Sequence, residues 1–302
     1  GVEVHDGAVY LNGKPVFQRL VLDQGFYPDG IYTAPTDDDL KADIIRCQDL
    51  GFNGARLHQK VFEPRFLYWA DKLGYLCWGE YPNWGFDITR PEALAIFLPE
   101  WTESVERDFN HPSIVGWCPF NETQPEYYSP TAQETVLRVY EMTKLLDRTR
   151  PVIDTSGFVH TGKTDLYDVH DYEQDPAVMA EHYARTGEGE CFENFPQWAK
   201  WDGRTPLFVS EYGGTWWSPG VQDGWGYGQA SKTEEEVCSR YCGLTRVLLE
   251  NEKICAFCYT QPYDVEQEQN GLFRYVRTPK FSPEIYRRIR ETNQLPAAIE
   301  TR

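Results

Sequence analysis

The sequence predicts a single-domain α/β fold, a (β/α)8 or TIM barrel, and three observations support this prediction. The chain has 302 residues, of which 41% are apolar, enough to bury one large core. Short apolar runs alternate with longer helical patterns, as in parallel βα folds. Eight such runs can be counted, and no internal repeat, low-complexity tract or linker divides the chain.

The expected strands are apolar runs that tend to end in a polar or charged residue. They span residues 16–23, 53–58, 75–80, 113–122, 150–156, 166–172, 206–213 and 254–261. An open doubly wound sheet is the alternative architecture for such a rhythm. It would require a glycine-rich phosphate loop after the first strand, and the segment DQGFYPDG that follows has neither GxGxxG nor GxxxxGK[ST] spacing. The barrel is therefore the preferred interpretation.

The expected helices follow these strands and carry start and stop signals. They cover residues 36–51, 64–74, 91–110, 131–147 and 233–251, with further helices beginning near residues 176 and 283. Threonine and aspartate residues cap the first of them and Gly51 ends it, whereas Pro64 lies in the first turn of the second. The helix at 233–251 has one apolar stripe, formed by Val237, Tyr241, Leu244 and Leu248.

Residues 1–16 form an N-terminal entry segment, and residues 17–302 form the barrel. The stretch VYLNGKPVF predicts a lone hairpin with its turn at Asn12-Gly13. Because the chain starts on Gly1 and opens on this hairpin, we expect it to be part of a longer protein.

Charge and composition narrow the classes of partner. The chain has 47 acidic and 29 basic residues, a formal charge of -18, which disfavours nucleic acids and anionic membranes. No apolar run approaches the roughly 20 residues of a membrane span, and the first residues lack the features of a secretory signal. We therefore expect neither a nucleic-acid nor a membrane partner.

The eight cysteines suggest buried thiols rather than a metal site. Cys255 and Cys258 form a CxxC on a predicted strand, where positions three apart point to opposite faces. Cys238 and Cys242 could share a helix face, but no second ligand pair lies nearby in sequence. A thiol-rich interior favours a reducing compartment, hence a cytoplasmic location, with a periplasmic or secreted one left open.

The carboxyl ends of barrel strands meet at one mouth, where such folds keep their active sites. The strand-end residues are Asp23, Arg56, His58, Glu80, Asn121, Glu122, His170, Tyr172, Glu211, Gln261 and Asp264. Glu122 ends the fourth strand and Glu211 the seventh, which places two carboxylates across one pocket, as glycoside hydrolysis requires. Arg56 and His58 are substrate-site candidates, with ion-pair and core roles as the alternative. Glu80 is expected to pair with a local cation or to cap a loop.

Aromatic residues could supply platforms for the apolar faces of sugars. The segments YPNWGFD and YGGTWWSPGVQDGWGYG follow the third and seventh strands. Trp84 and Trp216 are preferred as platforms over Trp225, and ordinary packing under long loops is the alternative.

Two longer motifs carry a resemblance to a known family. HPSIVGWCPFNET and PLFVSEYGG resemble the acid/base and nucleophile segments of the barrel domain of glycoside hydrolase family 2, which includes β-galactosidases, β-glucuronidases and β-mannosidases. VYLNGKPVFQRL, LGFNGARLHQ and LYWADKLGYLCWGEYP extend the likeness over nearly the whole chain. The resemblance implies that Glu122 is the general acid/base, that Asn121 contacts the sugar hydroxyl beside the reacting carbon, and that Glu211 is the nucleophile. It also implies retention of configuration through a covalent glycosyl-enzyme intermediate.

This mechanism makes demands on the two carboxylates. A retaining enzyme needs its carboxyl groups about 5 to 5.5 Å apart. Glu211 must stay ionised, with Arg56 and Tyr172 as the expected neighbours. Glu122 must hold its proton near neutral pH, and we therefore expect it to be less solvated or close to negative charge. The mechanism requires no metal and no cofactor.

The resemblance implies a retaining exo-β-glycosidase, with a β-galactosidase as the preferred activity. A related pyranosidase or arabinosidase is the nearest alternative, and a catalytically silent carbohydrate-binding barrel is the alternative from another class. β-Glucuronidases carry an Asn-x-Lys element after the eighth strand, whereas this chain has Asn270, Gly271 and Leu272, which disfavours a glucuronide. The tryptophan usual at the end of that strand is also missing, leaving Tyr259 and Gln261.

The family also bears on what accompanies the barrel. Its sugar-binding and immunoglobulin-like domains precede the barrel and are expected in the full-length protein. A homo-oligomer is left open.

Overall fold

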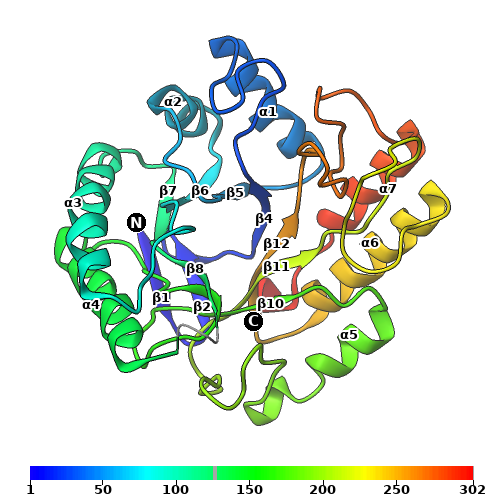
Figure 1. The fold of residues 1–302 in the computed structure, drawn as a ribbon. Coiled ribbons are helices and arrows are strands. Elements are labelled where there is room, and N and C mark those ends of the chain that lie inside the picture. Colours follow the sequence, from blue (N-terminus) through cyan, green and yellow to red (C-terminus); the bar gives the residue numbers. More distant parts are fainter. Residues whose placement is uncertain (125–127, 302) are drawn as a thin grey trace.

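The computed structural model describes residues 1–124 and 128–301. Seven parallel strands curl into one sheet, and helices surround it (Figure 1). The strand order is β10-β11-β12-β4-β5-β6-β7. These strands are β4 (Gln18–Asp23), β5 (Gly54–Leu57), β6 (Leu76–Glu80), β7 (Ile114–Cys118), β10 (Tyr167–Asp171), β11 (Leu207–Gly213) and β12 (Ile254–Thr260). The TIM-barrel prediction is confirmed.

The wall between β7 and β10 is irregular, and here the predicted strands differ from the structure. The expected fourth strand is broken, because Pro119 has no N–H to continue the ladder. The expected fifth strand at 150–156 contributes only an isolated bridge between Val152 and Trp117. A short pair, β8 (Asn121–Thr123) and β9 (Ser156–Phe158), runs parallel and packs beside β10. This pair completes the ring on the side where Glu122 lies.

The helices match the sequence signals closely. They are α1 (Asp37–Asp49), α2 (Pro64–Leu73), α3 (Pro91–Asp108), α4 (Pro130–Leu146), α5 (Pro176–His182), α6 (Glu234–Glu250) and α7 (Pro283–Asn293), with short 3-10 helices at Thr186–Glu188 and Ala298–Thr301. Thr36 and Asp39 form a capping box at α1, and Gly74 ends α2 in the left-handed conformation. Proline occupies the first position of α2, α3, α4, α5 and α7.

The entry segment is a three-stranded antiparallel sheet rather than the lone hairpin expected. The predicted Asn12-Gly13 turn joins β2 (Ala8–Leu11) to β3 (Lys14–Pro15), and both turn residues have positive φ. A second turn at Asp6-Gly7 adds β1 (Val2–His5). In Figure 1 this sheet lies across the ring of strands, and its chain leads directly into the start of β4. It therefore covers the end of the barrel opposite the mouth.

The eight cysteines are free thiols, and six of them are buried. Cys255 and Cys258 lie inside β12, and the Sγ atoms of Cys238 and Cys242 are 3.9 Å apart on α6. Over the described ranges, none of the helices has both the length and the apolar character of a bilayer span.

Candidate active site

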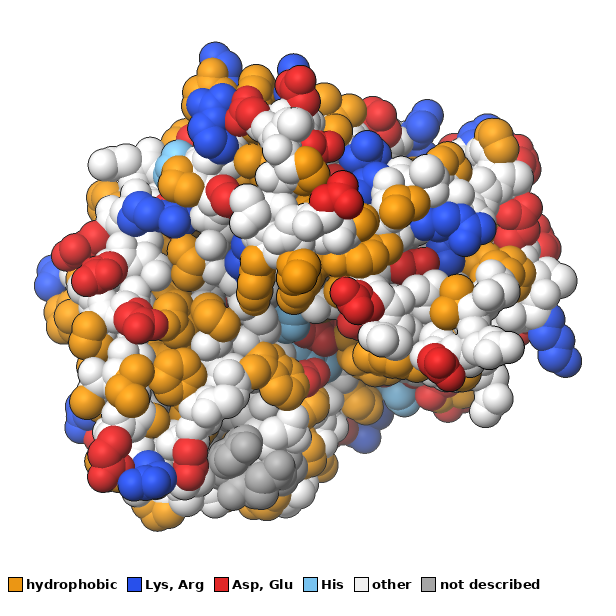
Figure 2. All heavy atoms as spheres, turned by 45° about the horizontal axis from the view of Figure 1, so that its top comes forward, with side chains coloured by type: hydrophobic (Ala, Val, Ile, Leu, Met, Phe, Trp, Pro, Cys, Tyr) orange, Lys and Arg blue, Asp and Glu red, His pale blue; other side chains and the backbone are white. Residues whose placement is uncertain are grey.

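The strand-end residues collect at the mouth of the barrel. Figure 2 shows a hollow near the centre of one face, with acidic and histidine side chains inside and hydrophobic side chains around it. Seven residues within the barrel form one connected cluster, in which His170 and Glu211 link its two parts: Arg56, Glu80, Asn121, Glu122, His170, Tyr172 and Glu211. The cluster joins residues up to 155 positions apart in sequence, as the barrel prediction requires.

Glu211, near the end of β11, is held by two groups. Arg56 Nη1 donates to its Oε1 at 3.1 Å, and the Tyr172 hydroxyl donates to its Oε2 at 2.5 Å. The side chain is only 4% exposed, and these two donors replace the water contacts that a buried carboxylate loses. Both contacts are those expected from strand position.

Arg56 donates hydrogen bonds to three other members of the cluster. Its Nε and Nη2 donate to the two oxygens of Glu80 at 2.7 and 3.2 Å, and Nη2 also donates to Asn121 Oδ1 at 2.9 Å. Burial alone would raise the pKa of Glu80, but the charge of Arg56 and the nearby His58 hold that pKa below its usual value. Glu80 therefore pairs with a cation, as expected, and the guanidinium aligns the Asn121 and Glu211 side chains.

Glu122 lies on β8 in different surroundings. Its backbone has a φ of 49°, and its side chain is 15% exposed. His170 Nδ1 lies 2.8 Å from its Oε1. Burial raises the pKa of Glu122, but the hydrogen bond and charge of His170 lower it more, so that the pKa falls below its usual value. The prediction that the surroundings of Glu122 raise its pKa is therefore wrong, and the hydrogen bond and charge of His170 are the physical reason.

His170 lies between the two carboxylates. Its Nδ1 is 3.4 Å from Glu211 Oε2 as well as close to Glu122. Burial lowers the pKa of this imidazole, but Glu211 and Glu122 outweigh burial and raise it. The histidine and the two acids thus share charge and protons as one unit.

One carboxylate oxygen of Glu122 and one of Glu211 lie within 4.8 Å of each other. This proximity suits the short separation of a retaining glycosidase rather than the 6.5 to 9.5 Å typical of inverting enzymes. Glu122, His170 and Glu211 are also the one group in the described chain whose ligand atoms could converge on a metal ion. We interpret them as a hydrogen-bonded cluster, because Nδ1 and Oε1 already face each other directly. The expectation that no metal or cofactor takes part stays a prediction.

Asp23 and Gln261 lie apart from this cluster. Asp23 accepts from the Gly25 N–H at 2.9 Å; burial and the neighbouring Asp43 raise its pKa to about 6. Gln261 accepts from Gln24 at 2.8 Å and donates to Asn270 at 2.8 Å. Gln261 thus joins a second polar group at the mouth, whereas Asp23 mainly shapes the loop after β4.

The aromatic candidates also differ in their contacts with the cluster around Glu211. Trp84 is 55% exposed, and Trp216 uses its Nε1 to bond Ser218 at 2.8 Å. Tyr227, which was not among the predicted residues, stacks on Tyr172 with ring centroids 3.4 Å apart, and Trp225 meets Tyr227 edge-on at 5.9 Å. Trp225 therefore lies closer to the Glu211 cluster than its low preference implied. The platform roles of Trp84 and Trp216 stay predictions.

Comparison with known families identifies this arrangement. The family model "Glycosyl hydrolases family 2, TIM barrel domain" matches residues 2–291. The chain belongs to glycoside hydrolase family 2. Its order of motifs and its paired carboxylates are those expected from the resemblance noted in the sequence.

Curated β-galactosidases match part of this chain. A β-galactosidase of Photobacterium profundum is 28% identical over 225 residues, covering 70% of this chain and 20% of the relative. A β-galactosidase of Yersinia enterocolitica is 29% identical over 224 residues, with 70% and 19% covered. The chain thus spans about a fifth of the length of these relatives.

Solved structures share the fold. A β-galacturonidase from Eisenbergiella tayi superposes with a TM-score of 0.77 at 18% identity, covering 98% of this chain and 55% of that one. A β-D-glucuronidase from Dictyoglomus thermophilum gives 0.76 at 21% identity, covering 98% and 54%. At these identities the likeness establishes the barrel fold alone. The substrate has to be inferred from the residues of the pocket.

Proposed function

We propose that this chain is the catalytic barrel of a retaining exo-β-glycosidase, with a β-galactosidase as the preferred activity. The observation that carries the proposal is the close approach of the Glu122 and Glu211 carboxylates. The two carboxylates have different hydrogen-bond partners. Arg56 and Tyr172 each donate a hydrogen bond to one oxygen of Glu211, which orients this carboxylate for attack on a sugar carbon. Glu122 shares a proton-bearing contact with His170, as an acid/base requires.

The reaction then follows two steps. Glu211 attacks the sugar carbon while Glu122 protonates the departing glycosidic oxygen, and the carbon–oxygen electron pair leaves with that oxygen. Water next attacks the same carbon while Glu122 removes its proton, and Glu211 departs from its ester. Asn121 Oδ1 accepts a hydrogen bond from Arg56, and Nδ2 has no protein partner among the described residues, which leaves Nδ2 to donate to a sugar hydroxyl.

The second polar group at the mouth bears on which sugar is bound. Gln24 Nε2 donates to Glu268 Oε2 at 3.0 Å, and Asn270 Nδ2 donates to Glu268 Oε1 at 3.3 Å. The buried Leu272 thus occupies the position of the lysine in the Asn-x-Lys element of β-glucuronidases, and the Glu268 carboxylate bonds to Asn270, the residue at the position of its asparagine. A carboxylate there repels a uronic acid and accepts hydrogen bonds from a neutral sugar. This supports a neutral glycoside such as a β-galactoside.

A panel of aryl β-glycosides on the full-length protein tests the proposal. We expect the galactoside to be hydrolysed at least about tenfold faster in kcat/KM than the glucuronide, and the first-formed sugar to keep its β configuration by proton NMR. Glu268→Gln should narrow the gap between the two sugars. First-formed α product, or no turnover of any glycoside, would contradict the assignment.

The chain matches only about a fifth of the length of its relatives, which supports further domains in the full-length protein. The proposal includes the sugar-binding and immunoglobulin-like domains expected from the family. A cytoplasmic location and a homo-oligomer remain predictions without a structural test.

A further inference from the structure

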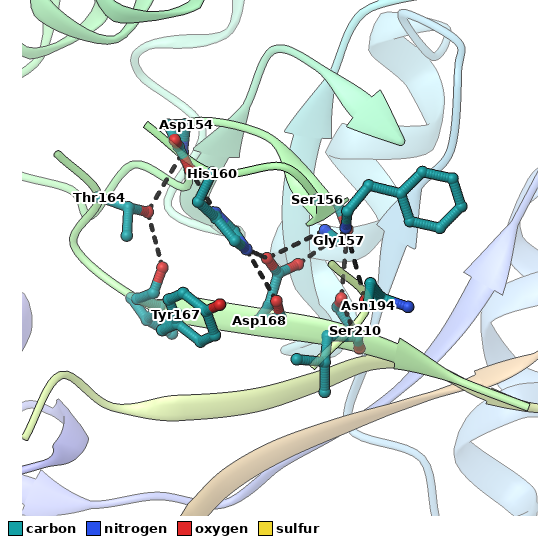
Figure 3. Close-up of polar contacts among 12 residues, drawn as sticks. Asp154, Ser156, Gly157, His160, Thr164, Tyr167, Asp168, Asn194 and Ser210 are labelled. Carbon is teal, nitrogen blue, oxygen red and sulfur yellow. Dashed lines mark hydrogen bonds and ion pairs between the residues drawn. The ribbon is translucent and has the colours of Figure 1, made fainter. Parts of the chain in front are cut away.

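A chain of buried polar groups begins at His170, which contacts Glu122 through Nδ1 and Ser156 through Nε2. Figure 3 shows its continuation from Ser156 to Asp168 and His160. Ser156 Oγ lies 2.9 Å from His170 Nε2 and 2.9 Å from Asp168 Oδ2. Ser156 is on β9 and Asp168 on β10, and both are fully buried. Among the described residues, neither Ser156 nor Asp168 bonds directly to Glu122 or Glu211, and neither was a predicted site residue.

Asp168 is an ionised carboxylate that can only accept hydrogen bonds. His160 lies between two acids, with Nδ1 2.7 Å from Asp154 Oδ1 and Nε2 2.9 Å from Asp168 Oδ1. Burial alone would raise the pKa of Asp168, but the hydrogen bond and charge of His160 lower it to about 2. Figure 3 shows His160 bridging Asp154 and Asp168.

The negative charge of Asp168 determines the direction of the hydrogen bonds that the Ser156 hydroxyl makes. The Ser156 hydroxyl has one hydrogen, and the charged Asp168 oxygen at 2.9 Å is a stronger acceptor than the neutral Ser210 Oγ at 3.2 Å. Ser156 therefore donates to Asp168 and can only accept from His170. The Nε2 atom of His170 must accordingly carry a hydrogen.

Packing holds the His170 ring in this orientation. Gly157 has a φ of +68°, and a Cβ there would lie 2.6 Å from His170 Cδ2, so the ring packs directly against this glycine. The backbone N–H of His170 donates to Asn194 Oδ1 at 3.0 Å. Nδ1 consequently faces Glu122, and only the glycine leaves room for the ring.

We propose that Ser156 and Asp168 are positioning residues that keep one hydrogen on His170 Nε2, so that Nδ1 and Glu122 Oε1 share the single proton used in acid catalysis. This inference rests on the proposed function. When the leaving oxygen takes that proton together with the electron pair of the broken bond, the His170–Glu122 pair retains one negative charge. Water returns a proton to the pair as its oxygen bonds to the sugar carbon and the Glu211 ester breaks.

The charges around His170 give the direction of the pH effect. Glu122 on β8, Glu211 on β11 and, beyond Ser156, Asp168 on β10 favour the protonated pair, whereas Arg56 on β5 opposes it. Removing the Ser156 hydroxyl cuts the hydrogen-bonded link to Asp168. The pair then loses its proton at lower pH, and the alkaline limb of the pH profile of kcat/KM moves to lower pH.

The experiment compares Ser156→Ala with wild type in the full chain. For a phenyl glycoside, which needs acid catalysis, kcat/KM should fall roughly 10- to 100-fold, with the alkaline limb about half a pH unit or more lower. For a dinitrophenyl glycoside, which needs none, it should stay within about threefold. Rates are expressed per site labelled by an activated fluoro-sugar, so that misfolded protein is not counted.

Two further variants complete the design. Ser156→Thr retains the hydroxyl and should restore the wild-type ratio between the two substrates. Ser113→Ala removes another buried serine, whose hydroxyl has no partner among the described residues. It should leave kcat/KM unchanged for both substrates.

The outcomes are distinct. An unshifted profile, or equal losses on both substrates in Ser156→Ala, would overturn the inference. If wild type neither reacts with the fluoro-sugar nor hydrolyses either glycoside, the proposed function itself fails.

Discussion

The two halves of the mouth, a Glu211 half with Arg56 and Tyr172 and a Glu122 half with His170, hold their carboxylates in different ways. Glu211 lies on the seven-residue strand β11, which pairs with β10 and β12, and it is held by a guanidinium and a phenol. Glu122 lies on the three-residue strand β8 at a φ of 49° and is held by one imidazole. A guanidinium keeps its charge at every working pH, whereas an imidazole exchanges protons near neutrality. The first half suits a nucleophile with fixed charge, and the second suits an acid that must become a base.

The largest expected effect lies in the Glu211 half. Glu211→Gln removes the attacking oxygen, and we expect kcat to fall by roughly 10⁴- to 10⁶-fold on phenyl and dinitrophenyl glycosides alike. Steady-state assays on both substrates measure it. Residual turnover within tenfold of wild type would show that this carboxylate is not the nucleophile.

The Glu122 half should distinguish between leaving groups. Glu122→Gln removes the acid, and kcat/KM for the phenyl glycoside should fall by about 10²- to 10⁴-fold while the dinitrophenyl glycoside loses far less. Added azide should restore turnover of the dinitrophenyl glycoside by attacking the intermediate in place of activated water. Equal losses on both substrates, with no response to azide, would remove the contrast between the halves.

Arg56→Lys tests the fixed-charge side more gently. Lysine keeps the charge but cannot contact Glu80, Asn121 and Glu211 at once, so we expect the free energy of unfolding to fall by about 1–3 kcal/mol. Activity should fall for both leaving groups by a similar factor. Chemical denaturation and the same two assays measure this; a loss confined to the phenyl glycoside would place Arg56 in the acid half instead.

The smallest expected effect concerns pH. The two flanking acids overcome the burial that would lower the pKa of His160 and raise it well above the unfolded value of 6.5. Its stabilising contribution is therefore complete below pH 6.5 and lost as pH rises toward the folded pKa. In His160→Gln, the stability difference from wild type should shrink by about 1.4 kcal/mol per pH unit above that point. Denaturation at several pH values measures it, and a difference independent of pH would contradict a protonated His160.

The sequence could predict residues whose roles depend on local pattern. Glu122 and Glu211 follow apolar runs, Thr36 caps a helix, and Asn12-Gly13 forms the turn its residues favour. Each of these depends on spacing along a short segment.

Residues fixed by tertiary contacts escaped prediction. Ser156 links His170 to Asp168 only because β9 packs beside β10, and the break at Pro119 moves Glu122 onto a separate strand. Tyr227 reaches Tyr172 through a long loop anchored by the bridge between Trp225 and Glu268. No periodic pattern encodes the path of such a loop.

The most direct test of the central claim is to trap the intermediate with an activated 2-deoxy-2-fluoro-β-galactoside and to map the modified peptide by mass spectrometry. The account predicts one fluoro-glycosyl group on Glu211 and none in Glu211→Gln. A label on another residue, or no label on protein that hydrolyses aryl glycosides, would contradict it.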